Sequence, residues 1–450
     1  MHNLFGTDGI RGIANSYPII PEVASNVGRA VAWLFKDKGD RPRVIIGQDT
    51  RISGDMIAHA LASGICAAGV EAELVGVLPT PGIAFVTRSS GASAGVVVSA
   101  SHNPYQDNGI KVFGSDGFKL PDEKEAEIEG LVVSGKASEL RPANQITGRV
   151  CCNPKAADVY ADFLKRCVPD GCRSGSGFKI VLDCAHGATY EIAPRLFSEM
   201  GFLVEALNAR PDGININHQC GSQHPEGLAA HVAERRADVG LAFDGDGDRL
   251  IAVDDQGEVL SGDRVLAVCA HHLQMQRRLH NNTVVSTVMS NVGLGRTFKN
   301  MGIRHLTTQV GDRYVMEAMR SAGAVLGGED SGHMIFAEHH TTGDGILTAL
   351  MLLEAVQSQS MPLSQLKNVM TPFPQVLINV SVRSKPGLKN LPEIAKVIEE
   401  VEAQLGQDGR VLVRYSGTEP LCRVMVEGPN QEVIDSHARR ICQAIQKSLG

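Results

Sequence analysis

The chain has 450 residues, enough for about three domains of typical size. It carries 43 Lys and Arg residues against 50 Asp and Glu residues, so its formal net charge is −7, and the two signs are interspersed. Aromatic residues make up only 4% of the chain. Nucleic-acid binding needs a basic surface and often aromatic stacking, so this composition argues against a nucleic-acid partner.

Cysteine usage and hydropathy indicate the cellular compartment. Ten cysteines are present, without a C-x-x-C pair or a matching histidine spacing. Buried thiols in a reducing cytosol explain them better than a disulfide framework or a zinc site. No run of 18 or more apolar residues occurs, and polar, glycine-rich sequence begins by Gly6. We therefore expect no membrane span and no signal peptide, and a cytoplasmic location.

Three stretches of the chain share one order of predicted elements. Each opens with an apolar, β-branched run, at residues 44–46, 180–182 and 284–288. A helix-compatible stretch follows, then a second strand at residues 74–77, 202–207 and 303–306, a further helix and a third strand. The pattern predicts three β-α-β-α-β units with largely parallel sheets.

The third strand of each unit ends in a polar, glycine-rich loop. Residues 95–99 lead into residues 100–105 (ASHNPY), residues 239–243 into residues 244–249 (DGDGDR), and residues 324–326 into residues 327–333 (GGEDSGH). Open α/β sheets bind their ligands at the carboxyl ends of the strands. We therefore expect these three loops to converge on one central cleft.

From about Thr371 the character of the chain changes. Pro372 and Pro374 interrupt it, and the following pattern predicts strands at residues 376–382, 410–414 and 421–426, a helix at residues 391–405 and a final amphipathic helix. The expected fold class is α/β, with three similar α/β units of mixed, largely parallel sheets and a smaller α+β C-terminal domain. The expected domains are 1–150, 151–256, 257–370 and 371–450.

The loop at residues 244–249 has the composition of a metal site. Asp244, Asp246 and Asp248 alternate with glycines, so three hard carboxylate oxygens can surround one cation, and Mg²⁺ suits such a set. An EF-hand loop is excluded, because its sixth position must be Gly and here is Arg249, and its twelfth is Asp255 instead of Glu. A solvated acidic turn is the alternative, but a third aspartate and the adjoining arginine favour a metal or phosphate site.

Ser101 follows a buried strand and precedes His102, Asn103 and Pro104. A nucleophilic serine fits this position, but no G-x-S-x-G motif is present and no hydrolase triad can be assembled. By itself the segment favours a capped turn over a catalytic centre. Lys111 can reach the same cleft as a proton donor or phosphate contact, although an isolated lysine is usually solvated.

Two further loops offer polar groups for a ligand. Glu329, Ser331 and His333 alternate along one loop and could bind sugar hydroxyls, with a structural turn as the alternative. In the C-terminal region a glycine turn lies among guanidinium and hydroxyl groups, a combination that favours a phosphate clamp over an ordinary hairpin. Its residues are Arg414, Ser416, Gly417, Thr418 and Arg423. A metal loop, a serine, polyol-compatible groups and a phosphate clamp together indicate phosphoryl transfer on a phosphorylated sugar.

In this order and over essentially the whole chain, these four loops resemble the α-D-phosphohexomutase superfamily. The segments Phe5–Gly12 (FGTDGIRG), Gly328–His333 (GEDSGH) and Arg414–Pro420 (RYSGTEP) are most similar to the bacterial branch that acts on aminosugar phosphates. The resemblance implies an isomerase that interconverts glucosamine 6-phosphate and glucosamine 1-phosphate. It also implies glucosamine 1,6-bisphosphate as the intermediate, and a product used for UDP-N-acetylglucosamine and peptidoglycan.

The resemblance also implies a role for each residue. Ser101 would be the phosphoserine, and one of its phosphate oxygens would join Asp244, Asp246 and Asp248 around one Mg²⁺ per chain. Arg11, Lys111 and Arg249 match positions that neutralise charge or transfer protons near the reacting phosphate, and His102 adjoins the serine. Glu329 and Ser331 match sugar-hydroxyl contacts, with His333 beside them as a proton carrier. The set that would hold the non-reacting phosphate is Arg414, Ser416, Gly417 and Thr418, with Arg423 nearby.

In this interpretation the four domains carry, in order, the phosphoserine, the metal, the sugar-binding loop and the phosphate clamp. The expected partner is a phosphorylated aminosugar, with neither nucleic acid nor membrane, and a homodimer is left open. A phosphomannomutase/phosphoglucomutase of the same superfamily is the alternative enzyme. A non-enzymatic sugar-phosphate-binding protein and a phosphatase are two further alternatives.

Overall fold

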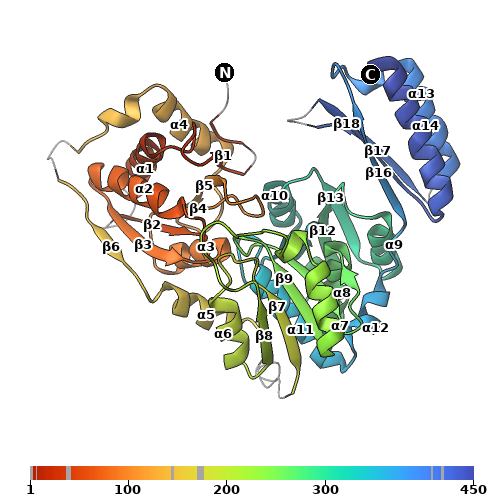
Figure 1. The fold of residues 1–450 in the computed structure, drawn as a ribbon, viewed down its shortest axis with the longest axis horizontal. Coiled ribbons are helices and arrows are strands. Elements are labelled where there is room, and N and C mark those ends of the chain that lie inside the picture. Colours follow the sequence, from red (N-terminus) through yellow and green to blue (C-terminus); the bar gives the residue numbers. More distant parts are fainter. Residues whose placement is uncertain are drawn as a thin grey trace. The chain divides into compact units, whose positions relative to one another are not determined.

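The computed structural model describes residues 4–6, 8–36, 42–142, 146–169, 177–406, 409–416 and 420–450. They form two compact units. The larger unit comprises Met1–Met289 and Arg304–Asn368, and the smaller unit comprises Ser290–Ile303 and Val369–Gly450. The larger unit holds three sheets and the smaller unit one sheet, which are drawn from red to blue in chain order (Figure 1). Each unit is described by itself below.

The first two sheets of the larger unit are mixed and largely parallel. The first has the strand order β1 (Ile10–Ile13), β5 (Asp107–Gly114), β4 (Ala94–Val98), β2 (Arg43–Gln48), β3 (Glu71–Val77), β6 (Val150–Cys152). The second has the order β11 (Val259–Leu260), β10 (Leu250–Asp254), β9 (Val239–Phe243), β7 (Lys179–Asp183), β8 (Leu203–Leu207).

The third sheet is shorter, and helices surround all three. Its order is β13 (Arg304–Thr308), β12 (Thr283–Thr287), β14 (Leu326–Gly328), β15 (Met334–Phe336). The first sheet carries α1 (Pro21–Phe35), α2 (Gly54–Ala67), α3 (Thr80–Ser89) and α4 (Asp122–Val133). The second and third carry α6 (Ile192–Glu199), α7 (Glu226–Arg235), α8 (Gly262–Met275), α10 (Asp312–Ala322), α11 (Gly345–Gln359) and α12 (Leu363–Leu366), and α5 (Ala156–Arg166) packs against α3 and α6.

Buried parallel strands form the centre of each sheet. β4 (AGVVV) and β9 (VGLAF) are buried along their whole length, as expected for strands covered on both faces. In the first sheet, Val44 and Ile46 share a core with α1 and α2. The opposite face lies against α3, where a side chain at Gly47 would collide with Ile83. The sheet is therefore the middle layer between helices.

The same hairpin recurs in all three sheets. The last parallel strand turns into an antiparallel neighbour, and the pairs are β4 with β5, β9 with β10, and β14 with β15. The connecting loops contain Ser101, the three aspartates, and Glu329 with His333. Because each loop leaves the carboxyl end of a buried strand, each presents its polar side chains at the same edge of its sheet.

The smaller unit is an α+β fold. Its antiparallel sheet has the order β16 (Gln375–Ser381), β18 (Leu421–Glu427), β17 (Arg410–Tyr415). Helices α13 (Pro392–Leu405) and α14 (Gln431–Leu449) lie on one side of it (Figure 1), with Ile434, Ile441 and Ile445 buried at helical spacing. Helix α9 (Val292–Asn300) also belongs to this unit, and Asn291 caps it by accepting a hydrogen bond from Gly293 N.

The predicted fold class is confirmed, including the order of strands and helices in the C-terminal region. The antiparallel strands β1, β5 and β15 were absent from the prediction, although β5 positions Lys111. No helix in the described ranges has the length and apolar character of a membrane span. The nine cysteines within those ranges are free thiols, and Cys152 is exposed where a buried thiol was expected.

Candidate functional site

Ser101 lies in the loop between β4 and β5 and is buried. Its backbone has φ +53°, a left-handed conformation that is uncommon for a residue with a side chain. Its backbone N–H donates to Ser99 Oγ at 2.9 Å, and its own Oγ donates to Asp244 Oδ2 at 2.6 Å. The fold thus directs the serine hydroxyl from the first sheet toward the aspartate loop of the second.

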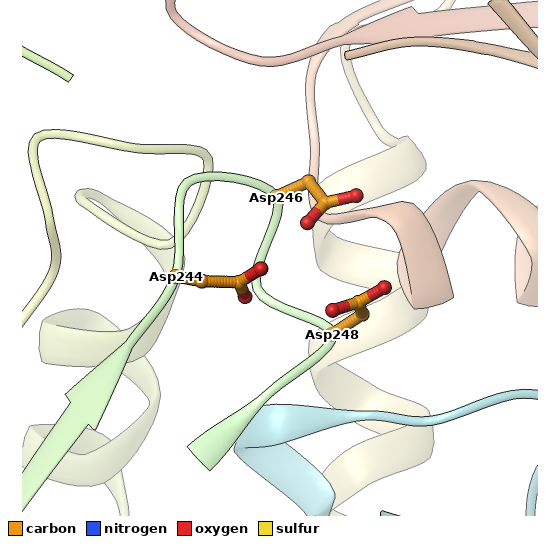
Figure 2. Close-up of side chains that lie close together, drawn as sticks. All are labelled: Asp244, Asp246 and Asp248. Atoms are coloured by element: carbon orange, nitrogen blue, oxygen red, sulfur yellow. The ribbon is translucent and has the colours of Figure 1, made fainter. Parts of the chain in front are cut away.

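The three aspartates form one buried cluster. Figure 2 shows them on a single loop with their carboxylates facing a common space, and one oxygen from each lies within 4.8 Å of the others. Within the described chain, Asp246 Oδ1 and Asp248 Oδ1 are buried without a hydrogen-bond partner. Buried carboxylate oxygens without donors are costly unless a cation balances them. These oxygens therefore fit a hard divalent cation such as Mg²⁺.

The charge balance at the cluster is uneven. Burial raises the pKa of Asp244 well above its usual value, and repulsion from Asp248 and Asp246 adds to this. Burial also opposes ionisation of Asp248, but its attraction to His333, Lys111 and Arg249 outweighs burial and lowers its pKa. A bound cation would favour the ionised form of all three carboxylates.

Lys111 supplies a cation from the middle of β5. Its side chain is 2% exposed, and Nζ lies 2.9 Å from Asp246 Oδ2 and 3.2 Å from Asp8 Oδ2. Burial alone would lower the pKa of Lys111, but Asp246, Asp8 and Asp248 raise it above its ordinary value. Lys111 is therefore charged at neutral pH and is part of the site, not solvated surface.

Two arginines and a histidine complete this side of the site. Arg11 Nη1, from β1, donates to Ala100 O at 3.1 Å, next to the serine. Arg249 Nε lies 3.7 Å from Asp248 Oδ1. His102 Nδ1 is 3.4 Å from Ser101 Oγ, and burial, Arg249 and Arg11 lower the pKa of His102 to about 4. His102 is thus neutral at pH 7, whereas the arginines can neutralise an anion.

The third loop brings His333 to the same place. His333 Nδ1 is 3.5 Å from Asp248 Oδ2, and Gly343 N–H donates to His333 Nε2 at 3.2 Å. Burial by itself lowers the pKa of His333. The negative charges of Asp248 and Asp312 raise it by a larger amount, so the pKa lies above its ordinary value. Glu329 Oε1 accepts a hydrogen bond from Gly311 N at 3.0 Å, and Ser331 is exposed on the same loop.

A cleft of about 540 Å³ opens over these residues within the larger unit. Its walls come from all three sheets, as the convergence of the loops predicts. Predicted site residues in the wall are Arg11, His102, Asp248, Arg249, Glu329 and His333. Its size suits a small polar ligand such as a sugar phosphate.

The sequence reasoning missed several residues of this site. Lys119 forms ion pairs with Asp8 and with Asp312 Oδ2, and all three line the cleft. Arg51, which is 2% exposed, follows β2 and donates to the loop between β4 and β5 that contains Ser101, the serine loop. A usable signal existed, since the polar segment at residues 49–51 (DTR) follows a buried strand just as the recognised loops do.

The predicted phosphate clamp lies in the smaller unit. Arg414 on β17 and Arg423 on β18 are paired directly across the sheet, and Asn379 of β16 continues the row. Arg414 and Asn379 are exposed, whereas Ser416 is buried at the end of β17. Two like charges directly opposite each other on a sheet repel, and an anion between them would remove that cost. Gly417 and Thr418 lie outside the described residues.

Comparison with known families agrees with this geometry. The phosphoglucomutase/phosphomannomutase models match at residues 2–139 (alpha/beta/alpha domain I), 158–257 (domain II), 261–373 (domain III) and 377–444 (C-terminal domain). The chain therefore belongs to the phosphoglucomutase/phosphomannomutase family.

Relatives within that family are similar over their whole length. The phosphoglucosamine mutase of Syntrophus aciditrophicus is 53% identical, and that of Syntrophobacter fumaroxidans is 52% identical, each over 450 residues and 100% of both chains. A family protein from Burkholderia thailandensis has a TM-score of 0.80 at 25% identity, over 99% of this chain and 97% of that one. The N-acetylphosphoglucosamine mutase of Aspergillus fumigatus, in complex with GlcNAc-6P and magnesium, has a TM-score of 0.66 at 18% identity over 99% and 95%, and so shares the fold.

Proposed function

We propose that this chain is an isomerase that interconverts glucosamine 6-phosphate and glucosamine 1-phosphate, as its full-length relatives named phosphoglucosamine mutase indicate. The observation that carries the proposal is the 2.6 Å hydrogen bond from Ser101 Oγ to Asp244 Oδ2. It joins a buried hydroxyl to a carboxylate cluster suited to a divalent cation. A phosphoryl group on Ser101 would therefore lie where positive charge can be concentrated.

Ser101 acts as the phosphoryl carrier. The 1-hydroxyl oxygen of glucosamine 6-phosphate attacks the phosphorus of phosphoserine and gives its proton to a base in the cleft. The P–Oγ bond breaks, and Ser101 Oγ takes up a proton from an acid in the cleft as it leaves. This leaves glucosamine 1,6-bisphosphate and a serine hydroxyl. After the bisphosphate reorients, Ser101 Oγ attacks the 6-phosphoryl group, loses its proton, and the P–O6 bond breaks with protonation of O6. The products are glucosamine 1-phosphate and phosphoserine.

Asp244, Asp246 and Asp248 would hold one Mg²⁺ together with a phosphoserine oxygen. When bound, the cation withdraws charge from the phosphoryl oxygens. Arg11, Arg249 and Lys111 neutralise further negative charge around the same group, and Lys111 also holds Asp246 Oδ2 in place. Neutral His102 lies beside Ser101 Oγ and can exchange a proton with it.

The sugar and the second phosphate would be bound by the remaining loops. Glu329 and Ser331 would accept or donate hydrogen bonds to sugar hydroxyls, with His333 as a proton carrier beside them. Arg414, Ser416, Gly417 and Thr418, with Arg423, would bind the phosphate that is not reacting. In this proposal residues 1–150 carry the phosphoserine, 151–256 the metal, 257–370 the sugar-binding loop and 371–450 the phosphate clamp.

Free thiols and a phosphorylated substrate support a cytoplasmic location for this activity. The test of the proposal is a coupled assay that compares formation of glucosamine 1-phosphate, glucose 1-phosphate and mannose 1-phosphate from their 6-phosphates. The highest kcat/KM is expected with the aminosugar. A preference for glucose or mannose would instead identify a phosphoglucomutase or phosphomannomutase. No turnover, with no phosphate on Ser101, would indicate a binding protein.

A further inference from the structure

The carbonyl groups of the serine loop are held by side chains from outside the loop. Arg51, which follows β2, donates from Nη2 to Ser101 O at 2.9 Å and to Asn103 O at 2.8 Å. Its Nη1 donates to Pro104 O, and its Nε donates to Asp49 Oδ2 at 2.9 Å. The guanidinium thereby fixes three carbonyl groups of the loop, those of Ser101, Asn103 and Pro104, to the end of β2.

Asn217 holds two of the same carbonyl groups from a different sheet. It lies in the connection between β8 and α7, and its Nδ2 donates to Ser101 O at 2.9 Å and to Asn103 O at 3.0 Å. These contacts join residues 114 and 116 positions apart in sequence. The second sheet, which carries the aspartates, thus has its own connection to the serine backbone.

The metal loop packs directly against this contact. A Cβ added to Gly245 would lie 2.6 Å from Ser101 O and 2.7 Å from Asn217 Nδ2. Both distances are shorter than any van der Waals contact, so a glycine is needed here. The amide of Asn217 therefore lies at a close contact between the serine loop and the aspartate loop.

Ser101 itself needs such support. Its φ of +53° is costly for a residue with a side chain and persists only where the surroundings impose it. We propose that Asn217 is a positioning residue, which holds the backbone of Ser101 against the aspartate loop and so aligns Ser101 Oγ for phosphoryl transfer. The catalytic part of this inference rests on the proposed function, whereas the structural part does not.

Loss of the amide should affect chemistry more than binding. Without Asn217 Nδ2, the hydrogen bonds from Arg51 are the only side-chain bonds that Ser101 O and Asn103 O keep within the described part of the chain, and the loop can move relative to Asp244. Phosphoryl transfer requires an aligned nucleophile, so a displacement of about 1 Å can lower the rate about 100-fold. The walls of the cleft that bind the sugar phosphate do not include Asn217. The expected signature is therefore a lower kcat with little change in KM.

A matched pair of variants separates positioning from stability of the loop. Asn217 and Gln219 lie on the same loop, both have positive φ (58° and 52°), and both have an amide side chain, but Gln219 is exposed. Glycine tolerates positive φ at either position, so Asn217→Gly and Gln219→Gly change the backbone alike. Only the first removes hydrogen bonds to the serine loop. Asn217→Asp serves as a second variant, because a carboxylate keeps the shape but cannot donate.

The experiment measures hydrogen–deuterium exchange of residues 99–107 by mass spectrometry, together with kcat and KM for glucosamine 6-phosphate. For Asn217→Gly and Asn217→Asp we expect exchange in this segment to rise about 10-fold and kcat to fall about 10- to 100-fold, with KM within about 2-fold. Gln219→Gly should match the wild type in both. Wild-type exchange and kcat in Asn217→Gly would overturn the inference. If the wild type lacks mutase activity but exchange still rises, the proposed function fails while the structural link between the loops stands.

Discussion

The serine–aspartate centre and the arginine pair of the C-terminal unit differ in burial, and in the proposed function they would bind phosphate in two different ways. In the first, Ser101, Asp244, Asp246, Asp248 and Lys111 are all buried, and each has partners from distant segments. In the second, Arg414 is exposed on a β-strand and faces Arg423 across the sheet. One region is enclosed and rigidly placed, and the other is an open, charged surface.

The contrast matches two different physical demands. Bond making and breaking need atoms held in fixed positions, which a buried network of hydrogen bonds and ion pairs provides. Holding a phosphate that is not reacting needs charge and mobile donors, because in the proposed reaction the two phosphates of the intermediate would exchange places between half-reactions. Substitutions in the first region should therefore abolish chemistry, and substitutions in the second should weaken binding.

Ser101→Ala should have the largest effect. It removes the proposed phosphoryl carrier and little volume, so we expect kcat to fall at least about 1000-fold while the protein remains folded. Turnover and thermal unfolding are measured beside Ser134→Ala, an exposed serine at the end of α4. Near wild-type turnover by folded Ser101→Ala would break the comparison, since the buried centre would then not carry the phosphoryl group.

Asp246→Asn should come next. One anionic ligand is lost while the size of the side chain is kept, so affinity for Mg²⁺ falls and we expect activity to drop about 100-fold. Chelation with EDTA should silence the wild-type protein until Mg²⁺ is restored. Calorimetric titration with Mg²⁺ tests the site without turnover, and the exposed Asp158→Asn on α5 is the control. Full activity after exhaustive chelation would show that the three aspartates have a structural role.

Arg414→Ala should have a smaller effect of a different kind. A charge-assisted hydrogen bond contributes about 1.5–3 kcal/mol, so KM should rise about 10- to 100-fold in both directions. Free glucosamine 1,6-bisphosphate should accumulate, because remote binding energy retains the intermediate. Phosphorylation of Ser101 by added bisphosphate should suffer less than in Asp246→Asn. Arg439→Ala, at an exposed position on α14, is the control. An unchanged KM without released bisphosphate would show that the arginine pair does not bind phosphate and that this segment is an ordinary hairpin.

The smallest effect should be on stability in acid. His340 is buried in the larger unit, its Nε2 contacts Pro81 O of α3 at 3.0 Å, and burial lowers its pKa to about 3. In the unfolded chain the pKa of this histidine is about 6.5. Between about pH 3 and pH 6.5 the unfolded chain therefore binds a proton at His340 that the native state does not bind. Stability should fall as the pH drops below 6.5, by up to about 1.4 kcal/mol per pH unit from this group.

Urea unfolding between pH 4 and 7 measures this slope. His340→Gln should flatten it, whereas His437→Gln, on the less buried side of α14, should change it less. Helix α3, which His340 contacts, also contacts the aspartate loop, because Thr80 Oγ1 donates to Asp246 Oδ2 at 2.7 Å. An equal slope in His340→Gln and wild type would mean that His340 titrates normally and that this packing is looser than the structure shows.

Local patterns account for what the sequence predicted well. Residues 239–243 were predicted as the strand before the aspartates, and β9 spans Val239–Phe243. Asp244, Asp246 and Asp248 lie within five residues of one another in the chain, so the local composition indicates a cation site without knowledge of the fold. The resemblance to phosphohexomutases rested on similarly short segments, and the family comparison confirms it.

Burial and long-range pairing were beyond such patterns. Lys111 was assessed as an isolated lysine, but the antiparallel strand β5 carries it into the interior, where carboxylates from two other segments stabilise its charge. Ser331 is exposed and His333 is buried, although both are polar residues of the same loop. Their polarity therefore does not predict which of them is buried, and the packing of the loop decides it.

The sequence by itself thus determined the alternation of strands and helices, the loops at the strand ends and the identity of the chemical groups they carry. These are properties of a few adjacent residues and need no knowledge of distant ones. Only the tertiary structure decided that Asn217 and Arg51 hold the backbone of Ser101, because residues far apart in the chain meet only when the sheets have packed. It also decided the charge state of Lys111 and His102, since burial and neighbouring charges set a pKa and both depend on the folded chain.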